Sequence, residues 1–437
     1  LAPAFADSQT RDLLVTERNE HSSFMVRVAV DQKDRAYEEG EKLTAAVISE
    51  RAGYLYLIYC NAAGKSYCVF PNKYQMDNRI PKKQPITIPS ANSPFEFTVG
   101  GPVFGQEVLK AIVTEKPLTG EMSKTKLIAK EITPLETSLV KDLLVTLKRR
   151  PQTGWAEHSV EIKTYRRGVQ PPPPRTRRVG LFIGISNYKD GKIRDLKVCH
   201  KDAELMQQVF KKVGRLDLAI LLTEEKATHE GIQKAICQTI KEATQPGDEV
   251  FIFWSGHGGR CADDGGEEQD GYDEYLVPHD ASLANLEAIR SSMITDDVFG
   301  RWLQMLDGRR IAVILDTCFS GGQSANAKSA VVVPAKTLAP FDFFDQEVSR
   351  IKDLGQKELT LLASSDADQI SFERKEGDYS VMTFILQNTI DRQNSVTIEG
   401  TYEVLKVEVP KYINKNFPGF QQTPRLDGKL SPPLKLR

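Results

Sequence analysis

The chain has 437 residues, and at roughly 150 residues per domain this length predicts two or three folding units. Hydrophobic residues make up 40% and charged residues 27%, which excludes a wholly disordered chain, a collagen-like chain and a coiled-coil rod. The net charge of −1 gives no overall field that would favour nucleic acid, and no apolar run approaches the ~20 residues that cross a bilayer. Six cysteines are too few for a disulfide scaffold and match no paired zinc motif.

The first residues suggest export. The sequence opens with Leu1, and Ala4-Phe5-Ala6 has the small-x-small form of a secretory cleavage site. We therefore interpret residues 1–22 as a signal-peptide remnant and N-terminal extension, and we expect a periplasmic or secreted protein. An arbitrary boundary in a cytoplasmic protein is the alternative.

Residues 23–118 have the pattern of an all-β domain. Short runs rich in β-branched and aromatic residues alternate with turn formers, which predicts a β-sandwich. The runs fall at residues 24–30, 43–49, 54–60, 67–72, 86–89, 95–99 and 110–115. Cys60 and Cys68 flank one turn, where we expect two half-buried thiols, with a disulfide as the alternative in an exported protein.

Residues 119–177 resemble a basic, proline-rich linker in composition. They contain a helix-like stretch at 135–150, a strand-like run at 158–165 and four consecutive prolines from Pro171 to Pro174. Such a proline run fits neither a helix nor a central strand, so it predicts a stiff polyproline II spacer.

Residues 178–437 alternate between predicted strands and helices. The strands are expected at 179–186, 218–223, 249–255, 310–316 and 358–364, and the helices at about 201–213 and 229–244. Thr228 is positioned to cap the second helix. Near-continuous apolar strands are buried on both faces, so this region predicts an α/β domain whose mainly parallel sheet is flanked by helices.

Two strand ends in this α/β region carry candidate chemistry. One apolar strand runs into SGHGG, which contains His257, and another runs into DTCFSGG, which contains Cys318. Ligands of open α/β sheets bind beyond the carboxyl ends of the strands, so we expect these two side chains to share one cleft. A nearby imidazolium lowers the pKa of a thiol, and flanking glycines leave amides open to a developing oxyanion. The alternatives are an inert cysteine and a structural histidine.

The motifs SGHGG, DGYDE and DTCFSGG together resemble the caspase-fold cysteine peptidases, and among them the metacaspases and their bacterial relatives, the orthocaspases. The resemblance covers roughly residues 178–430 and implies a caspase-like fold. It implies His257 as general base and acid, Cys318 as nucleophile, and the amides of Gly258 and Cys318 as the oxyanion hole. The N-terminal strands resemble an accessory domain found beside bacterial peptidase domains, for which no partner is indicated.

Further side chains are expected in the same cleft. Residues i and i+2 of a strand share a face, so Ser255 projects with His257, and Asp316 with Cys318. The resemblance to metacaspases implies that the S1 pocket, which binds a basic P1 residue, is lined by Cys199, Asp202, Ser255 and Asp316. The alternatives are a first-turn helix acid at Asp202 and a loop-bracing carboxylate at Asp316.

An acidic stretch raises the question of a metal. Residues 261–274 contain seven carboxylates, and calcium takes six to eight oxygen ligands. The resemblance to calcium-activated metacaspases implies a site at Asp273, Asp296 and Asp297. The Asp that those enzymes carry shortly after the catalytic Cys is missing from GGQSANAKSA. We expect no cofactor for the chemistry itself, and a solvated acidic loop is the alternative to calcium as an activator.

The sequence therefore predicts a cysteine endopeptidase that acts on protein or peptide substrates with Arg or Lys at P1. A catalytically silent scaffold and a peptidase of the legumain or gingipain type are the alternatives. Self-processing is also expected, because exposed connections attract nicking and a tethered site acts at high effective concentration. The candidate positions are Arg166, Arg167, Lys328 and Lys336. A linker that occupied S1 until it was cut would make the chain a zymogen.

Overall fold

The computed structural model describes residues 13–15, 17–19, 22–101, 103–169, 175–262, 272–317, 358–365, 369–393 and 396–437. The predicted signal-peptide remnant at 1–6 lies outside these residues. The chain forms two units, which divide between Arg175 and Thr176. Among the described residues, no helix combines the length and the apolar character needed to span a membrane.

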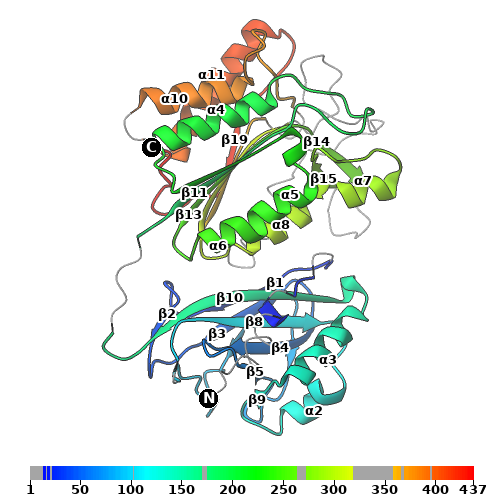
Figure 1. Cartoon of the computed structure of the whole chain (residues 1–437), viewed down its shortest axis with the longest axis vertical. Helices are drawn as coiled ribbons and strands as arrows, with labels where there is room; N and C mark the ends of the chain where they lie inside the picture. The colour runs from blue at the N-terminus through cyan, green and yellow to red at the C-terminus, as the bar shows by residue number, and fades with distance from the viewer. Residues whose placement is uncertain are drawn as a thin grey trace, which may run out of the picture. The chain divides into compact units, whose positions relative to one another are not determined.

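The first unit is built from two β-sheets, as the sequence predicts. The smaller sheet has the order β1-β3-β7, and the larger runs β2-β10-β8-β4-β5-β9, with β6 paired to β4. Figure 1 labels most of these strands. Buried side chains of both sheets, such as Val28 and Leu57, share one core. The strands are β1 (Val26–Val30), β2 (Ala36–Glu38), β3 (Ala45–Ser49), β4 (Gly53–Cys60), β5 (Ser66–Phe70), β6 (Arg79–Ile80), β7 (Ile86–Ile88), β8 (Gln106–Thr114), β9 (Thr133–Pro134) and β10 (Trp155–Tyr165).

Two predictions for this unit need correction. The run at 95–99 is not a strand: it makes one isolated bridge, from Thr98 to Lys42, and its main-chain bonds to residues 40–43 do not extend into a ladder. The two thiols are fully buried and form no disulfide. Cys60 lies opposite Ser66 rather than Cys68, and burial raises the pKa of Cys68 to about 12.

The prediction of a linker over residues 119–177 is wrong for most of its length. The segment contributes α2 (Lys124–Leu127) and α3 (Thr137–Lys148), and α3 packs its apolar side on the outer face of the larger sheet. It ends in β10, which pairs with β8 over nine residues. The sequence indicated a strand-like run at 158–165 but assigned it to the linker, whereas every second side chain of β10 faces the sandwich core. The connection between the units therefore begins only after Tyr165.

Buried charges tie β10 to its neighbours. Glu157 accepts from Arg18 at 2.8 Å and lies 3.0 Å from the ammonium of Lys110, whose side chain is 1% exposed. Burial opposes ionisation of Glu157, but the charges of Arg18 and Lys110 outweigh it and lower the pKa of this carboxyl to about 2. The pair is therefore ionised at neutral pH, and the charge of each partner depends on the other for compensation.

The second unit is organised around a sheet of six strands in the order β12-β11-β13-β17-β18-β19. All neighbours are parallel except β19, which pairs antiparallel with β18. This confirms the mainly parallel sheet expected from the apolar runs. The strands are β11 (Arg178–Gly184), β12 (Leu218–Thr223), β13 (Glu249–Ser255), β17 (Arg310–Asp316), β18 (Leu359–Ala363) and β19 (Arg425–Asp427).

Helices cover both faces of this sheet. One face packs against α4 (Cys199–Lys212), α10 (Val381–Arg392) and α11 (Ile398–Asn416), which lie together on one side (Figure 1). The other face packs against α8 (Asp296–Gln304) and a helical run of α5 (His229–Lys234), a π-helical turn (Ala235–Ile240) and α6 (Lys241–Ala243). The hydroxyl of Thr228 caps α5 as predicted, accepting from the amide of Gly231 at 3.0 Å.

A small antiparallel sheet stands beside the main one. It consists of β14 (Gly258–Ala262), β15 (Tyr272–Leu276) and β16 (Ile294–Thr295), and α7 (Leu286–Ser292) precedes its last strand. Because β14 begins at Gly258, this sheet starts directly after His257.

A stability prediction follows from the buried ion pair. Replacing Glu157 by Gln leaves the charges of Lys110 and Arg18 uncompensated, so it is expected to cost about 3–5 kcal/mol of unfolding free energy at pH 7. The folded pKa lies below the usual 4.5 of Glu, so this contribution is present above pH 4.5 and is lost as the pH falls toward 2. The difference between wild type and variant should therefore shrink in acid.

The measurement is hydrogen exchange of the β8 and β10 amides in urea at a series of pH values. Glu161→Gln is the matched control, because Glu161 lies on the same strand and bonds Gln106 at the surface, 3.1 Å away. A Glu157→Gln variant as stable as this control would contradict the account.

Candidate active site

The carboxyl ends of three central strands are level with one another. In the parallel ladders Gly184 lies opposite Ser255, and Ser255 lies opposite Asp316. The strand order also places β11 between β12 and β13, so the chain adds β12 on one side of β11 and then β13 on its other side. Ligands of open α/β sheets bind at such a switch point. The residues that follow β13 and β17 therefore emerge at one edge.

His257 is the first candidate at this edge, and it is buried. Its main-chain amide donates to the hydroxyl of Tyr188 at 2.9 Å, and its ring lies 5.0 Å from the Tyr188 ring between centroids. Its Nε2 lies 2.6 Å from the carbonyl oxygen of Arg194. A carbonyl can only accept, so Nε2 carries the hydrogen and, in the neutral ring, Nδ1 is the nitrogen that can take a proton.

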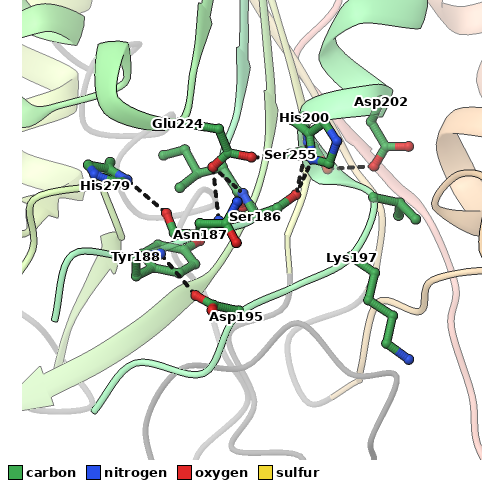
Figure 2. Close-up of polar contacts among 12 residues, drawn as sticks. Ser186, Asn187, Tyr188, Asp195, Lys197, His200, Asp202, Glu224, Ser255 and His279 are labelled. Atoms are coloured by element: carbon green, nitrogen blue, oxygen red, sulfur yellow. Dashed lines mark hydrogen bonds and ion pairs between the residues drawn. The ribbon is translucent and has the colours of Figure 1, made fainter. Parts of the chain in front are cut away.

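Asp202 lies on the first turns of α4 and is buried. Its carboxylate accepts from the hydroxyl of Ser255 at 2.7 Å, and Figure 2 shows this contact. It also accepts from the amide of Ser380 at 2.9 Å and from the Ser380 hydroxyl. The structure thus brings two of the four predicted S1 residues into direct contact.

Asp316, the last residue of β17, makes a similar set of contacts. Its carboxylate accepts from the hydroxyl of Ser371 at 2.8 Å, from the hydroxyl of Thr383 at 2.7 Å and from the amide of Thr383 at 3.1 Å. Ser380 and Thr383 both belong to the start of α10, where the first amides have no partner within the helix. The two acids therefore converge on one helix N-terminus, where negative charge is stabilised.

The remaining predicted residues lie around these acids. Cys199 begins α4 and is buried, and its carbonyl is so close to Gly184 that a Cβ there would come within 2.3 Å of it. Gly258 begins β14 and lies opposite Leu276. Cys318 lies outside the described residues, as do Lys328 and Lys336. Asp316, two residues before Cys318 in the sequence, is the last residue of β17 and lies opposite Ser255.

The predicted calcium ligands are only partly described. Asp273 lies on β15 opposite Cys261, and its side chain is outside the described part of the structure. Asp296 is buried and accepts from the amide of Asp297 at 2.9 Å, while the carboxylate of Asp297 pairs with Arg301 at 3.5 Å. Among the residues that are described, no group of three acids, histidines or cysteines could hold a metal ion.

The predicted processing positions differ in their surroundings. Arg166 and Arg167 follow β10 and are exposed. Arg167 donates to Glu39, from Nη2 to its carbonyl at 3.3 Å and from the amide to its carboxylate at 3.5 Å. Arg177 donates to Asp248 and to the carbonyl of Ala243, its own carbonyl accepts from the amide of Glu249 at 2.9 Å, and the next arginine already begins β11.

Several residues of the site carried no signal in the sequence. Glu373 is buried, and its carboxylate accepts from the amides of Lys197 and Val198 at 2.7 and 3.2 Å, across some 175 positions. Ser371, Ser380 and Thr383 have the opposite role, since their hydroxyls donate to the carboxylates of Asp202 and Asp316. In the sequence, the hydroxyl residues at the start of the apolar helix α10 are the only indication of such a role, and they do not show which acids they contact.

Comparison with known proteins identifies two regions. The family described as a caspase domain matches residues 177–434, more than half of the chain, and a domain of unknown function, DUF4384, matches residues 36–117. Metacaspase-1B of Aspergillus fumigatus is 35% identical over 154 residues, which are 33% of this chain and 36% of that protein. Metacaspase-2 of Arabidopsis thaliana is 25% identical over 261 residues, which are 56% of this chain and 60% of that protein.

The matched region thus covers about a third of the fungal relative and 60% of the plant relative. Among solved structures, protein GSU0716 from Geobacter sulfurreducens aligns over 57% of this chain and 92% of that chain. The identity is 19% and the TM-score 0.40, so this likeness carries no argument about the site.

Proposed function

The chain belongs to the caspase-domain peptidase family, and we propose that it is a cysteine endopeptidase that cleaves after Arg or Lys. The observation that carries the proposal is that β13 and β17 end opposite each other, at Ser255 and Asp316. In the sequence His257 follows the first strand end and Cys318 follows the second. The metacaspase relatives support cysteine-peptidase chemistry in particular.

The proposed reaction uses the two residues as a dyad. The Cys318 thiolate attacks the scissile carbonyl, and the amides of Gly258 and Cys318 stabilise the oxyanion. Nδ1 of His257 takes the thiol proton and gives it to the leaving amine, because Nε2 is held by the Arg194 carbonyl. Water then hydrolyses the acyl-enzyme, with the same nitrogen as base.

The preference for basic P1 residues rests on Asp202 and Asp316. Both carboxylates are buried, and both converge on the start of α10. A buried carboxylate pair favours a guanidinium or ammonium and disfavours an acidic P1 side chain, whose charge would add to theirs. The same carboxylates also brace α10, so the bracing role and the binding role must be separated experimentally.

We predict that the wild-type chain hydrolyses peptides with Arg or Lys at P1 and spares matched Asn and Asp peptides. Cys318→Ala and His257→Ala should each abolish turnover, since members of one catalytic unit are not additive. The assay is a panel of fluorogenic peptides that differ only at P1, run with millimolar calcium and with chelator.

Each arm of the panel decides one point. Turnover by Cys318→Ala would contradict the dyad, and cleavage of the Asn peptide alone would indicate a legumain type. If no peptide is cleaved, the catalytically silent scaffold is the alternative that remains. Calcium binding at Asp273, Asp296 and Asp297 predicts loss of activity with chelator, and activity that is equal in both buffers would contradict it.

A second prediction separates charge from bracing. Asp202→Asn and Asp316→Asn should each lower kcat/KM for Arg peptides by about 2–5 kcal/mol in transition-state free energy. Ser380→Ala and Thr383→Val are the matched controls, because they remove a bracing hydroxyl and keep the carboxylate. They should lose far less. Equal losses in both pairs would mean that the acids act only as braces.

Self-processing is the third part of the proposal. We predict cleavage after Arg166 or Arg167 rather than after Arg177. All three residues are exposed, but both the amide and the carbonyl of Arg177 are hydrogen-bonded, to Asp248 and Glu249. Cleavage after Lys328 or Lys336 remains part of the proposal. New N-termini are to be mapped by mass spectrometry in wild type, in Cys318→Ala and in Arg166→Gln/Arg167→Gln. A wild-type chain that stays whole while it hydrolyses Arg peptides would refute self-processing.

A further inference from the structure

Tyr188 connects the ends of two parallel strands beyond their last ladder pair. Its hydroxyl accepts the main-chain N–H of His257 at 2.9 Å and donates to the carbonyl of Ile185 at 3.3 Å. The amide of Ile185 in turn donates to the carbonyl of Ser255 at 3.0 Å. The phenol therefore joins the segment after β11 to the segment after β13 at the residue of the general base.

The ring of Tyr188 also contacts the imidazole. The two ring centroids lie 5.0 Å apart with an interplanar angle of 33°. Tyr188 is buried, and this burial, with the nearby Cys199, raises the pKa of its phenol well above the usual value. The hydroxyl is therefore neutral throughout the range in which a peptidase works, and it can donate and accept at the same time.

The loop that carries Tyr188 is closed on itself. The Tyr188 amide donates to Asp195 at 3.0 Å, as Figure 2 shows, and the amide of Leu196 donates to the carbonyl of Ser186 at 2.7 Å. Glu224 holds the base of the loop by accepting from the amides of Ser186 and Asn187 at 3.1 and 2.9 Å. Because Arg194 belongs to the same loop, the contacts on the amide and on Nε2 of His257 come from one braced element, while the His257 carbonyl accepts from the amide of Val277 at 3.1 Å.

His257 needs such a support because of the residue before it. Gly256 has no side chain, and a Cβ there would lie 3.1 Å from the indole nitrogen of Trp254 and 3.3 Å from the Tyr188 hydroxyl. The glycine lets the hydroxyl approach, but it also leaves the main chain before His257 with the greatest torsional freedom. An external anchor on the His257 amide removes this freedom.

We propose that Tyr188 is a positioning residue for the general base: its hydroxyl fixes the main chain of His257 while its ring supports the imidazole. The inference rests on the proposed function, in which His257 exchanges the proton of Cys318. A displacement of about 1 Å in a catalytic group can cost on the order of 100-fold in rate. Loss of the anchor therefore acts on the chemical step rather than on substrate binding.

The test is Tyr188→Phe in the full chain, assayed with an Arg peptide. We expect kcat to fall 10- to 100-fold, with KM changed less than about twofold, because the ring remains and only the anchor is lost. Tyr56→Phe is the matched control. The Tyr56 hydroxyl is also buried and accepts a main-chain N–H, from Leu118 at 2.8 Å, but it belongs to the other unit.

A second readout does not depend on turnover. The rate of Cys318 alkylation by iodoacetamide against pH reports the thiolate, whose pKa depends on where the imidazole lies. Tyr188→Phe should shift this profile, and Tyr56→Phe should not. The thermal unfolding midpoint of each variant is measured as well, to separate a loss of activity from a loss of stability.

The outcomes separate the inference from the proposed function. Wild-type kcat and an unshifted alkylation profile in Tyr188→Phe would overturn the positioning role, and so would a variant whose loss of activity only follows a loss of thermal stability. If the wild type cleaves no peptide of the panel, the proposed function fails, and the alkylation profile still decides whether Tyr188 positions His257 beside Cys318.

Discussion

The site depends on the register of the parallel ladder between β11, β13 and β17. A shift by one residue would turn every side chain of a strand to the other face. In the observed register Gly184, Ser255 and Asp316 lie side by side, so the segments that follow these strands leave the sheet at one edge. The apolar residues of both faces hold the register, since each strand packs against helices on its two sides.

Buried carboxylates link this edge to the C-terminal part of the domain. Asp202, Asp316 and Glu373 all accept hydrogen bonds from main-chain amides, and the first two also accept from hydroxyls. Apart from the hydroxyl of Ser255, which also donates to Asp202, the groups in these contacts come from residues 371–383 or donate to Glu373 there. A buried carboxylate is costly without donors, so the start of α10 is what allows two acids to stay near the proposed S1 position. The proposed binding role and the observed bracing role therefore fall on the same side chains.

Much of the α/β unit could be predicted from the sequence, because buried parallel strands are continuous apolar runs that end in recognisable motifs. The apolar run at 249–255 is an example: it forms β13, and the motif with His257 follows directly after it. For β10 the sequence indicated a strand-like run at 158–165, but the basic composition and the prolines that follow it placed this run in a linker rather than in the sheet. Its place became evident only from its ladder with β8 and from the buried partners of Glu157.

The contacts around the candidate dyad were even less accessible to sequence reasoning. Tyr188 precedes His257 by 69 positions, and Ser380 follows Asp202 by 178. Neither belongs to a motif with chemistry of its own, and each has its effect through a hydrogen bond made by the fold. Local patterns identify groups that react, whereas the groups that hold them depend on which segments the sheet brings together.

The most direct test of the account is covalent labelling with peptidyl chloromethyl ketones that carry Arg or Asp at P1. The account predicts that the Arg reagent adds once to the chain, that peptide mapping finds the adduct on Cys318, and that the Asp reagent reacts far more slowly. His257→Ala should slow the labelling by the Arg reagent. Equal rates for the two reagents, or an adduct on Cys199 or Cys261 in place of Cys318, would contradict it.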